Sequence, residues 1–127
     1  MANTLLQGNL NRARNAQDIL AQTMMENDVG LAVIAEPYRI PVHPHWAGER
    51  GCGHLLASDT LPLTRVYAGR GFVTIKWGDM FVTGVYISPS LARPEFEKIL
   101  EDLAKHLQSY VSSPMIVAGD FNFRSTL

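Results

Sequence analysis

Short apolar runs and helical repeats of apolar residues alternate along the chain. A short run bounded by turn-forming residues predicts a strand, and apolar residues at every third or fourth position predict a helix. The repeats predict two helices, one from about Arg12 to Asn27 and one that begins around Arg93–Glu95 and ends near Tyr110. The runs predict a first strand that ends near Gln7–Asn9, followed by strands at Leu31–Ala35, Leu55–Ala57, Thr64–Ala68, Phe72–Trp77, Met80–Ser88 and Met115–Ala118.

The order of these elements predicts an α/β fold with a mixed, largely antiparallel sheet and two helices on one face. Leu31–Ala35 is apolar at every position, so both of its faces are expected to be buried. The predicted helices cover only one face, and no further predicted element covers the other. In the second helix the charged residues, Lys105 and His106 included, are interpreted as a solvated face.

Tyr38–Gly53 is rich in Pro, His and Gly and predicts a loop. His43 and His45 within it are interpreted as surface residues, because no third metal ligand is nearby.

Polar residues follow the ends of the apolar runs. Asp120 and Asn122 come directly after Met115–Ala118. Residues two apart in an extended chain point to the same side, and open α/β sheets bind ligands at this end of their strands. The alternative is a turn in which both side chains cap backbone amides. These residues alone leave the two alternatives open.

Two further polar residues stand at strand ends. Glu36 follows Leu31–Ala35, where a charge is seldom placed without a partner or a metal. Its alternative is an ion pair with Arg39 across a turn. Tyr86 lies near the end of Met80–Ser88 and either packs in the core with its hydroxyl at the rim or donates that hydroxyl to a ligand.

Composition narrows the classes of protein. A length of 127 residues with 46% hydrophobic content fits one globular domain or part of a larger one. The net charge of -1 implies that any nucleic-acid contact is local. The single Cys52 excludes an intramolecular disulfide and fits a reducing, intracellular compartment. No apolar run reaches the roughly 18–20 residues of a membrane span, and the N-terminal residues have no cationic region ahead of an apolar run, so neither a signal peptide nor a membrane partner is expected.

Four segments stand in order along the chain: Gln7-Gly8-Asn9-Leu10, Ala35-Glu36-Pro37-Tyr38, Val85-Tyr86-Ile87-Ser88-Pro89 and Gly119-Asp120-Phe121-Asn122. The set resembles the endonuclease/exonuclease/phosphatase family. It is most similar to the apurinic-type endonuclease domain of non-LTR retrotransposons, where segments of the form GVYISP and IVAGDFN are typical. The resemblance covers nearly the whole chain.

The resemblance implies a role for each matching residue. Glu36 matches the carboxylate that holds a divalent metal, usually Mg²⁺ with Mn²⁺ as an alternative, and Asn9 matches the asparagine beside that metal. Tyr86 matches the tyrosine that contacts the scissile phosphate. Asp120 matches the aspartate that orients or deprotonates the attacking water, and Asn122 the asparagine that holds the phosphate. The implied activity is endonucleolytic hydrolysis of DNA at a target site, in the nucleus if the chain derives from a retrotransposon, with a reverse transcriptase domain in the parent polyprotein.

The chain also departs from the family. The family closes its site with a Ser-Asp-His segment after another aspartate, and neither follows Asn122 in this sequence. The resemblance therefore implies that residues 1–127 are the N-terminal part of a C-terminally truncated domain, half of a four-layer α/β sandwich, with little turnover alone. Its uncovered sheet face would be a site of self-association. Two alternatives stay open: an inactive transposon-derived remnant or interaction module, and a phosphatase of the same superfamily.

Overall fold

The computed structural model describes residues 4–43, 45–49, 52–56 and 63–122, with only the backbone described for 49 and 52–56. The elements in chain order are β1 (Thr4–Asn9), α1 (Arg14–Glu26), β2 (Val29–Ala35), β3 (Trp46–Glu49), β4 (Cys52–Leu56), β5 (Leu63–Gly69), β6 (Phe72–Trp77), β7 (Met80–Tyr86), α2 (Arg93–Gln108) and β8 (Met115–Asp120). No helix in these ranges is long and apolar enough to span a bilayer.

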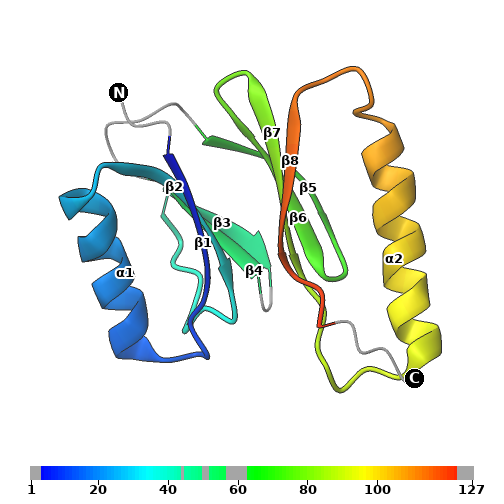
Figure 1. The fold of residues 1–127 in the computed structure, drawn as a ribbon, viewed down its shortest axis with the longest axis horizontal. Coiled ribbons are helices and arrows are strands. Elements are labelled where there is room, and N and C mark those ends of the chain that lie inside the picture. The colour runs from blue at the N-terminus through cyan, green and yellow to red at the C-terminus, as the bar shows by residue number, and fades with distance from the viewer. Residues whose placement is uncertain (1–3, 44, 50–51, 57–62, 123–127) are drawn as a thin grey trace.

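The strands form two sheets that pack face to face, with one helix on each outer side (Figure 1). The first sheet has the order β1-β2-β4-β3 and the second the order β5-β6-β7-β8. In each sheet one pair is parallel, β1 with β2 and β7 with β8, and the other pairs are antiparallel. The predicted α/β class with mixed, largely antiparallel strands and two helices is thus confirmed.

The expected arrangement of those elements in a single sheet with both helices on one face is wrong in detail. The all-apolar strand β2 shows why. Its alternate residues Leu31 and Val33 pack against Val73 and Val82 of the second sheet. Its other residues, Ala32 and Ile34, pack toward Met24 of α1. Because successive side chains of a strand point to opposite faces, a strand between a sheet and a helix must be apolar throughout.

The face of β2 for which no covering element was predicted is therefore covered by the second sheet of this chain. Self-association through an open inner face of this sheet loses its basis, since Leu31 and Val33 are almost completely buried. On the other side of the sandwich, α2 covers the second sheet by packing Ile99 and Leu103 against Phe72 and Val85.

The segment Tyr38–Gly53 was predicted to be a loop, and this is wrong for its second half. It contains β3 and the first residues of β4, which pair antiparallel with each other and, through β4, with β2. Ala47 of β3 is buried in the core between the sheets. Burial and pairing with β2 outweigh the weak strand propensity of glycine-rich sequence.

The other predicted elements are present with small shifts. The strand at Met80–Ser88 ends at Tyr86, the last strand extends to Asp120, and the strand at Leu55–Ala57 begins earlier, at Cys52, with Ala57 outside the described residues. His106 is not part of a solvated face: its Nε2 lies 2.7 Å from Thr74 Oγ1, which lies 2.6 Å from Thr83 Oγ1. Both threonines are fully buried, so the imidazole closes a polar network inside the sheet–helix interface.

Candidate active site

The four strand ends that carry the predicted site residues meet at one end of the sandwich. Asn9 ends β1 beside Ala35 of β2, and Tyr86 ends β7 beside Asp120 of β8. Both pairs are parallel, so their carboxyl ends coincide. The two pairs belong to different sheets, and Gln7 of β1 joins them by donating from Nε2 to the carbonyl oxygen of Gly119, 3.1 Å away.

Asn9 brings two carboxylates together. Its Nδ2 donates to Glu36 Oε2 at 2.8 Å and to Asp120 Oδ2 at 3.3 Å. Its Oδ1 accepts from the backbone amide of Asn11 at 2.8 Å, which fixes the orientation of the carboxamide. The site is therefore built from both sheets, with the amide group of Asn9 between the carboxylates.

Glu36 is presented by an unusual backbone. Its φ is 49°. The segment after β1 lies against this turn, because the Leu10 amide donates to the Ala35 carbonyl at 3.0 Å and the Arg12 amide donates to the Glu36 carbonyl at 2.8 Å. A positive φ is uncommon for a residue with a side chain, and such residues cluster at functional sites. The turn after β2 thus turns the Glu36 carboxylate toward Asn9.

Asp120 and Asn122 form an Asx turn, and the same two residues also belong to the site. Asp120 Oδ1 accepts from the Asn122 amide at 3.1 Å, which is the capping alternative, while its other oxygen faces Asn9. Asn122 has a φ of 47° and donates from Nδ2 to the Ile87 carbonyl at 2.8 Å. One amide hydrogen of Asn122 then remains for a ligand.

Gly119 allows β8 to approach β7 closely. Its φ is 146°, and a Cβ placed there would overlap the carbonyl oxygen of Val85. The neighbouring register pairs Tyr86 with Asp120, and the Ile87 amide donates to the Asp120 carbonyl at 3.0 Å. The glycine before Asp120 therefore fixes where the aspartate stands relative to Tyr86.

The Tyr86 hydroxyl faces the carboxylates. Burial raises the pKa of the phenol above its ordinary value, and the negative charge of Glu36, which accepts a hydrogen bond from it, raises the pKa further. Asp120 adds to the rise and the nearby Arg12 opposes it. Tyr86 accordingly stays protonated and is a hydrogen-bond donor at neutral pH.

Two residues at the site were not predicted. Arg12, rather than Arg39, lies beside Glu36, with Nε 3.9 Å from Oε1, but its side chain is 73% exposed and the contact is weak. Gln7 joins the two sheets below Asn9. Strand periodicity places Gln7 on the same side as Asn9 and was a usable signal, whereas nothing in the sequence marks Arg12.

The donors fit a hard divalent cation bound through oxygen and water. No group of three His, Cys, Asp or Glu side chains comes together in the described ranges. Two carboxylates that share one amide leave excess negative charge, with one exposed arginine nearby. Mg²⁺ is held by one or two carboxylates and keeps several of its waters, whereas Zn²⁺ is bound by four tetrahedral ligands that include nitrogen or sulfur. The arrangement can therefore bind a cation and an anionic oxygen side by side.

Comparison with solved structures identifies the fold. The chain is similar to the endonuclease domain of TRAS1, a telomere-specific non-LTR retrotransposon, with a TM-score of 0.76 and 22% identity over 95% of this chain and 59% of that one. It is similar to an AP endonuclease from Archaeoglobus fulgidus, with a TM-score of 0.68 and 16% identity over 93% of this chain and 56% of that one.

A third likeness is to a humanized TDP2 of D. rerio carrying 14 mutations, with a TM-score of 0.60 and 13% identity over 95% of this chain and 63% of that one. The chain thus has the endonuclease/exonuclease/phosphatase fold, and it spans about three fifths of the length of these structures. No protein-family model matches the sequence, and no curated protein does.

Proposed function

We propose that this chain carries the phosphodiesterase centre of a Mg²⁺-dependent DNA endonuclease. The observation that carries the proposal is the shared contact of Asn9 Nδ2 with Glu36 and Asp120, at 2.8 and 3.3 Å, beside a protonated Tyr86. Hydrolysis of a phosphodiester adds a nucleophile to an anionic centre, so it requires positive charge, hydrogen-bond donors and a proton acceptor. The residues at this end of the sandwich supply the hydrogen-bond donors and the proton acceptor directly.

Each residue has a separate part in the proposed reaction. Glu36 would hold the cation, which when bound neutralises the charge that develops on the phosphate oxygens. Asn9 positions Glu36 rather than coordinating the cation itself, because its Oδ1 is engaged by Asn11 and its Nδ2 faces the carboxylates.

On the second sheet, Asp120 orients the attacking water and accepts its proton. Tyr86 and the free amide hydrogen of Asn122 donate to non-bridging phosphate oxygens. Asn122 is held in place for this by its bond to the Ile87 carbonyl at 2.8 Å.

A retrotransposon context is a further part of the proposal. Its support is the fold likeness to the TRAS1 endonuclease domain, which covers 59% of that domain. In that context the reaction would be target-site nicking in the nucleus, with a reverse transcriptase in the parent polyprotein. The domain assignment of residues 1–127 as the N-terminal part of the nuclease stays a prediction.

The test separates metal binding from turnover. Mn²⁺ titration followed by electron paramagnetic resonance is expected to show one saturable site, with Mn²⁺ in place of Mg²⁺. Glu36→Gln is expected to raise the dissociation constant for Mn²⁺ at least ten-fold. Asn15→Asp changes the charge at an exposed position of α1 and is expected to leave that constant unchanged. Nicking of supercoiled plasmid is expected to be slow, to require Mg²⁺ and to fall about 100-fold or more in Asp120→Asn.

Equal nicking by Asp120→Asn and the unaltered chain, or nicking that persists in EDTA, would contradict the proposal. A chain that binds no divalent cation at all would favour the inactive remnant. Release of phosphate from inositol phosphates without plasmid nicking would favour a phosphatase.

A further inference from the structure

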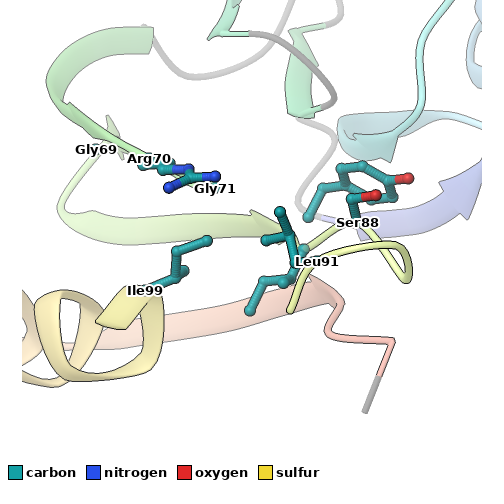
Figure 2. A pocket seen from close by; sticks show the side chains of 8 residues that line it. Gly69, Arg70, Gly71, Ser88, Leu91 and Ile99 are labelled. Carbon is teal, nitrogen blue, oxygen red and sulfur yellow. The ribbon is translucent and has the colours of Figure 1, made fainter. Parts of the chain in front are cut away.

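A cavity of about 450 Å³ opens directly beside Tyr86, and the proposed reaction assigns no role to it. Its wall comes from three parts of the fold: the turn between β5 and β6 with Arg70, the segment after β7 with Ser88 and Leu91, and α2 with Ile99 (Figure 2). The cavity therefore combines a guanidinium and a hydroxyl with an apolar floor. It shares Tyr86 with the candidate active site.

The turn that carries Arg70 is hydrogen-bonded to the end of β7, which carries Tyr86. The Tyr86 amide donates to the Gly71 carbonyl at 2.8 Å. Gly71 has a φ of 85°, and a Cβ there would lie 3.1 Å from the Tyr86 carbonyl oxygen. A Cβ at Gly69 would lie 2.5 Å from the Phe72 ring. The backbone on both sides of Arg70 is thus held close to its neighbours, and the position of Arg70 relative to Tyr86 is set by the fold.

Arg70 has hydrogen-bonding capacity left over. Its Nη2 lies 2.8 Å from Glu95 Oε2, and the two side chains are 61% and 49% exposed. An exposed ion pair of this kind contributes little to stability, so stability alone does not explain the arginine. A guanidinium has five donors, and Glu95 uses one side of it. Among the described residues Glu95 is the acceptor that Arg70 contacts, so the remaining guanidinium donors are open to a second acceptor.

We propose that Arg70 binds a second phosphate of the substrate strand, next to the phosphate that Tyr86 and Asn122 contact. Guanidinium groups match phosphate oxygens through paired hydrogen bonds, and Arg is the side chain best suited to that geometry. The Ser88 hydroxyl at the cavity wall accepts from the Ser90 amide at 3.3 Å and lies 2.8 Å from Ser90 Oγ; when Ser90 is the donor of that hydroxyl pair, the Ser88 hydrogen is left for the phosphate. The apolar floor of Leu91 and Ile99 excludes water beneath the bound group. This inference rests on the proposed function and assigns a binding site for the flanking nucleotide.

The test measures binding without turnover. Fluorescence anisotropy of a labelled DNA duplex is followed with the whole chain in EDTA, between about 50 and 200 mM KCl, with inorganic phosphate as a competitor. Arg70→Ala is expected to raise Kd about ten-fold and to reduce the slope of log Kd against log salt by about one, the signature of one lost phosphate contact. Phosphate alone is expected to compete only weakly.

Two matched variants decide between binding and structure. Lys98→Ala removes an equally exposed cation that pairs with Asp102 on α2, and we expect less than about a two-fold change. Glu95→Ala breaks the same ion pair as Arg70→Ala but keeps the guanidinium, and we expect no loss of affinity. A thermal unfolding curve for each variant checks that the fold is retained.

Three results would overturn the inference: Arg70→Ala binding DNA like Lys98→Ala, equal weakening by Arg70→Ala and Glu95→Ala, or no salt-dependent DNA binding by the unaltered chain. Failure of the proposed reaction is a different result, namely DNA binding that depends on Arg70 without Mg²⁺-dependent nicking.

Discussion

The contact of Asn9 with two carboxylates predicts that a third negative charge at this position makes folding dependent on a divalent cation. Asn9→Asp keeps the size of the side chain and replaces the donating amide with a carboxylate. The new oxygens would lie where Nδ2 now stands, 2.8 Å from Glu36 Oε2 and 3.3 Å from Asp120 Oδ2. Two attractive contacts become two repulsive ones.

The magnitude follows from these distances and from exposure. Two unit charges about 4 Å apart repel by about 1 kcal/mol in water and about 4 kcal/mol at a dielectric constant near 20. Asn9 is exposed and Glu36 is 21% exposed, so the lower part of that range applies. With the two lost hydrogen bonds, we expect the free energy of unfolding to fall by about 2–4 kcal/mol. That is a large share of the roughly 5–15 kcal/mol that holds a domain folded.

A cation reverses the effect. A ligand that binds only the folded state at 100 times its dissociation constant contributes about 2.7 kcal/mol. Three carboxylates bind Mg²⁺ more tightly than two. We therefore expect Mg²⁺ to raise the unfolding free energy of Asn9→Asp by at least about 2 kcal/mol, and to raise that of the unaltered chain by less.

Urea denaturation followed by circular dichroism, in EDTA and in saturating Mg²⁺, measures both quantities. Asn9→Ala removes the hydrogen bonds without adding charge and is expected to lose only about 1–2 kcal/mol. Asn15→Asp adds the same charge on an exposed position of α1 and is expected to stay within about 0.5 kcal/mol. If Asn9→Asp in EDTA is as stable as Asn15→Asp, the side chain of Asn9 does not lie between the two carboxylates.

Two further predictions concern the framework of the site. Gly119→Ala places a Cβ against the Val85 carbonyl at a φ of 146°, so we expect a loss of about 3 kcal/mol or more in urea denaturation; a loss under about 1 kcal/mol would contradict the close approach of β8 to β7. Burial lowers the pKa of His106 below its ordinary value. The neutral His106 imidazole therefore contributes to the free energy of unfolding above the unfolded pKa near 6.5, and this contribution is lost as pH falls through the lower folded pKa. His106→Phe is expected to flatten the decline in the free energy of unfolding between about pH 7 and 5. An unchanged decline would show that other titratable groups cause it.

The elements could be predicted from local pattern, whereas their assembly into two sheets could not. A run such as Met115–Ala118 specifies a strand because its own residues are apolar and β-branched. Which strand it pairs with depends on residues far away, here β7 in a parallel register. The all-apolar strand β2 required cover on both faces. The strands that cover the face away from α1, β6 and β7, were predicted but were assigned to the same sheet as β2.

The position of the site was predictable, but the direction of Asn9 was not. Ligands gather at the carboxyl ends of strands in open α/β sheets, and this alone brings Asn9, Glu36 and Asp120 to one edge. The carboxamide could present either its oxygen or its nitrogen to Glu36. The choice is made by the Asn11 amide, which donates to Oδ1 at 2.8 Å because of a backbone φ of 50° at Asn11. No sequence pattern specifies that dihedral angle.

The site depends on the packing of the whole sandwich because its residues come from both sheets. Asn9 and Glu36 belong to the β1–β2 pair, and Tyr86 and Asp120 to the β7–β8 pair. Polar contacts cross between the pairs at the site: the bond of Gln7 to Gly119, that of Asn9 to Asp120 and that of Tyr86 to Glu36. Such exposed bonds are too weak to hold two sheets together. The distance between the pairs is therefore set by the core beneath, where Leu31 and Val33 meet Val73 and Val82. The apolar pattern of β2 thus does more than stabilise the fold, since it fixes the separation at which two carboxylates from different sheets can share one amide.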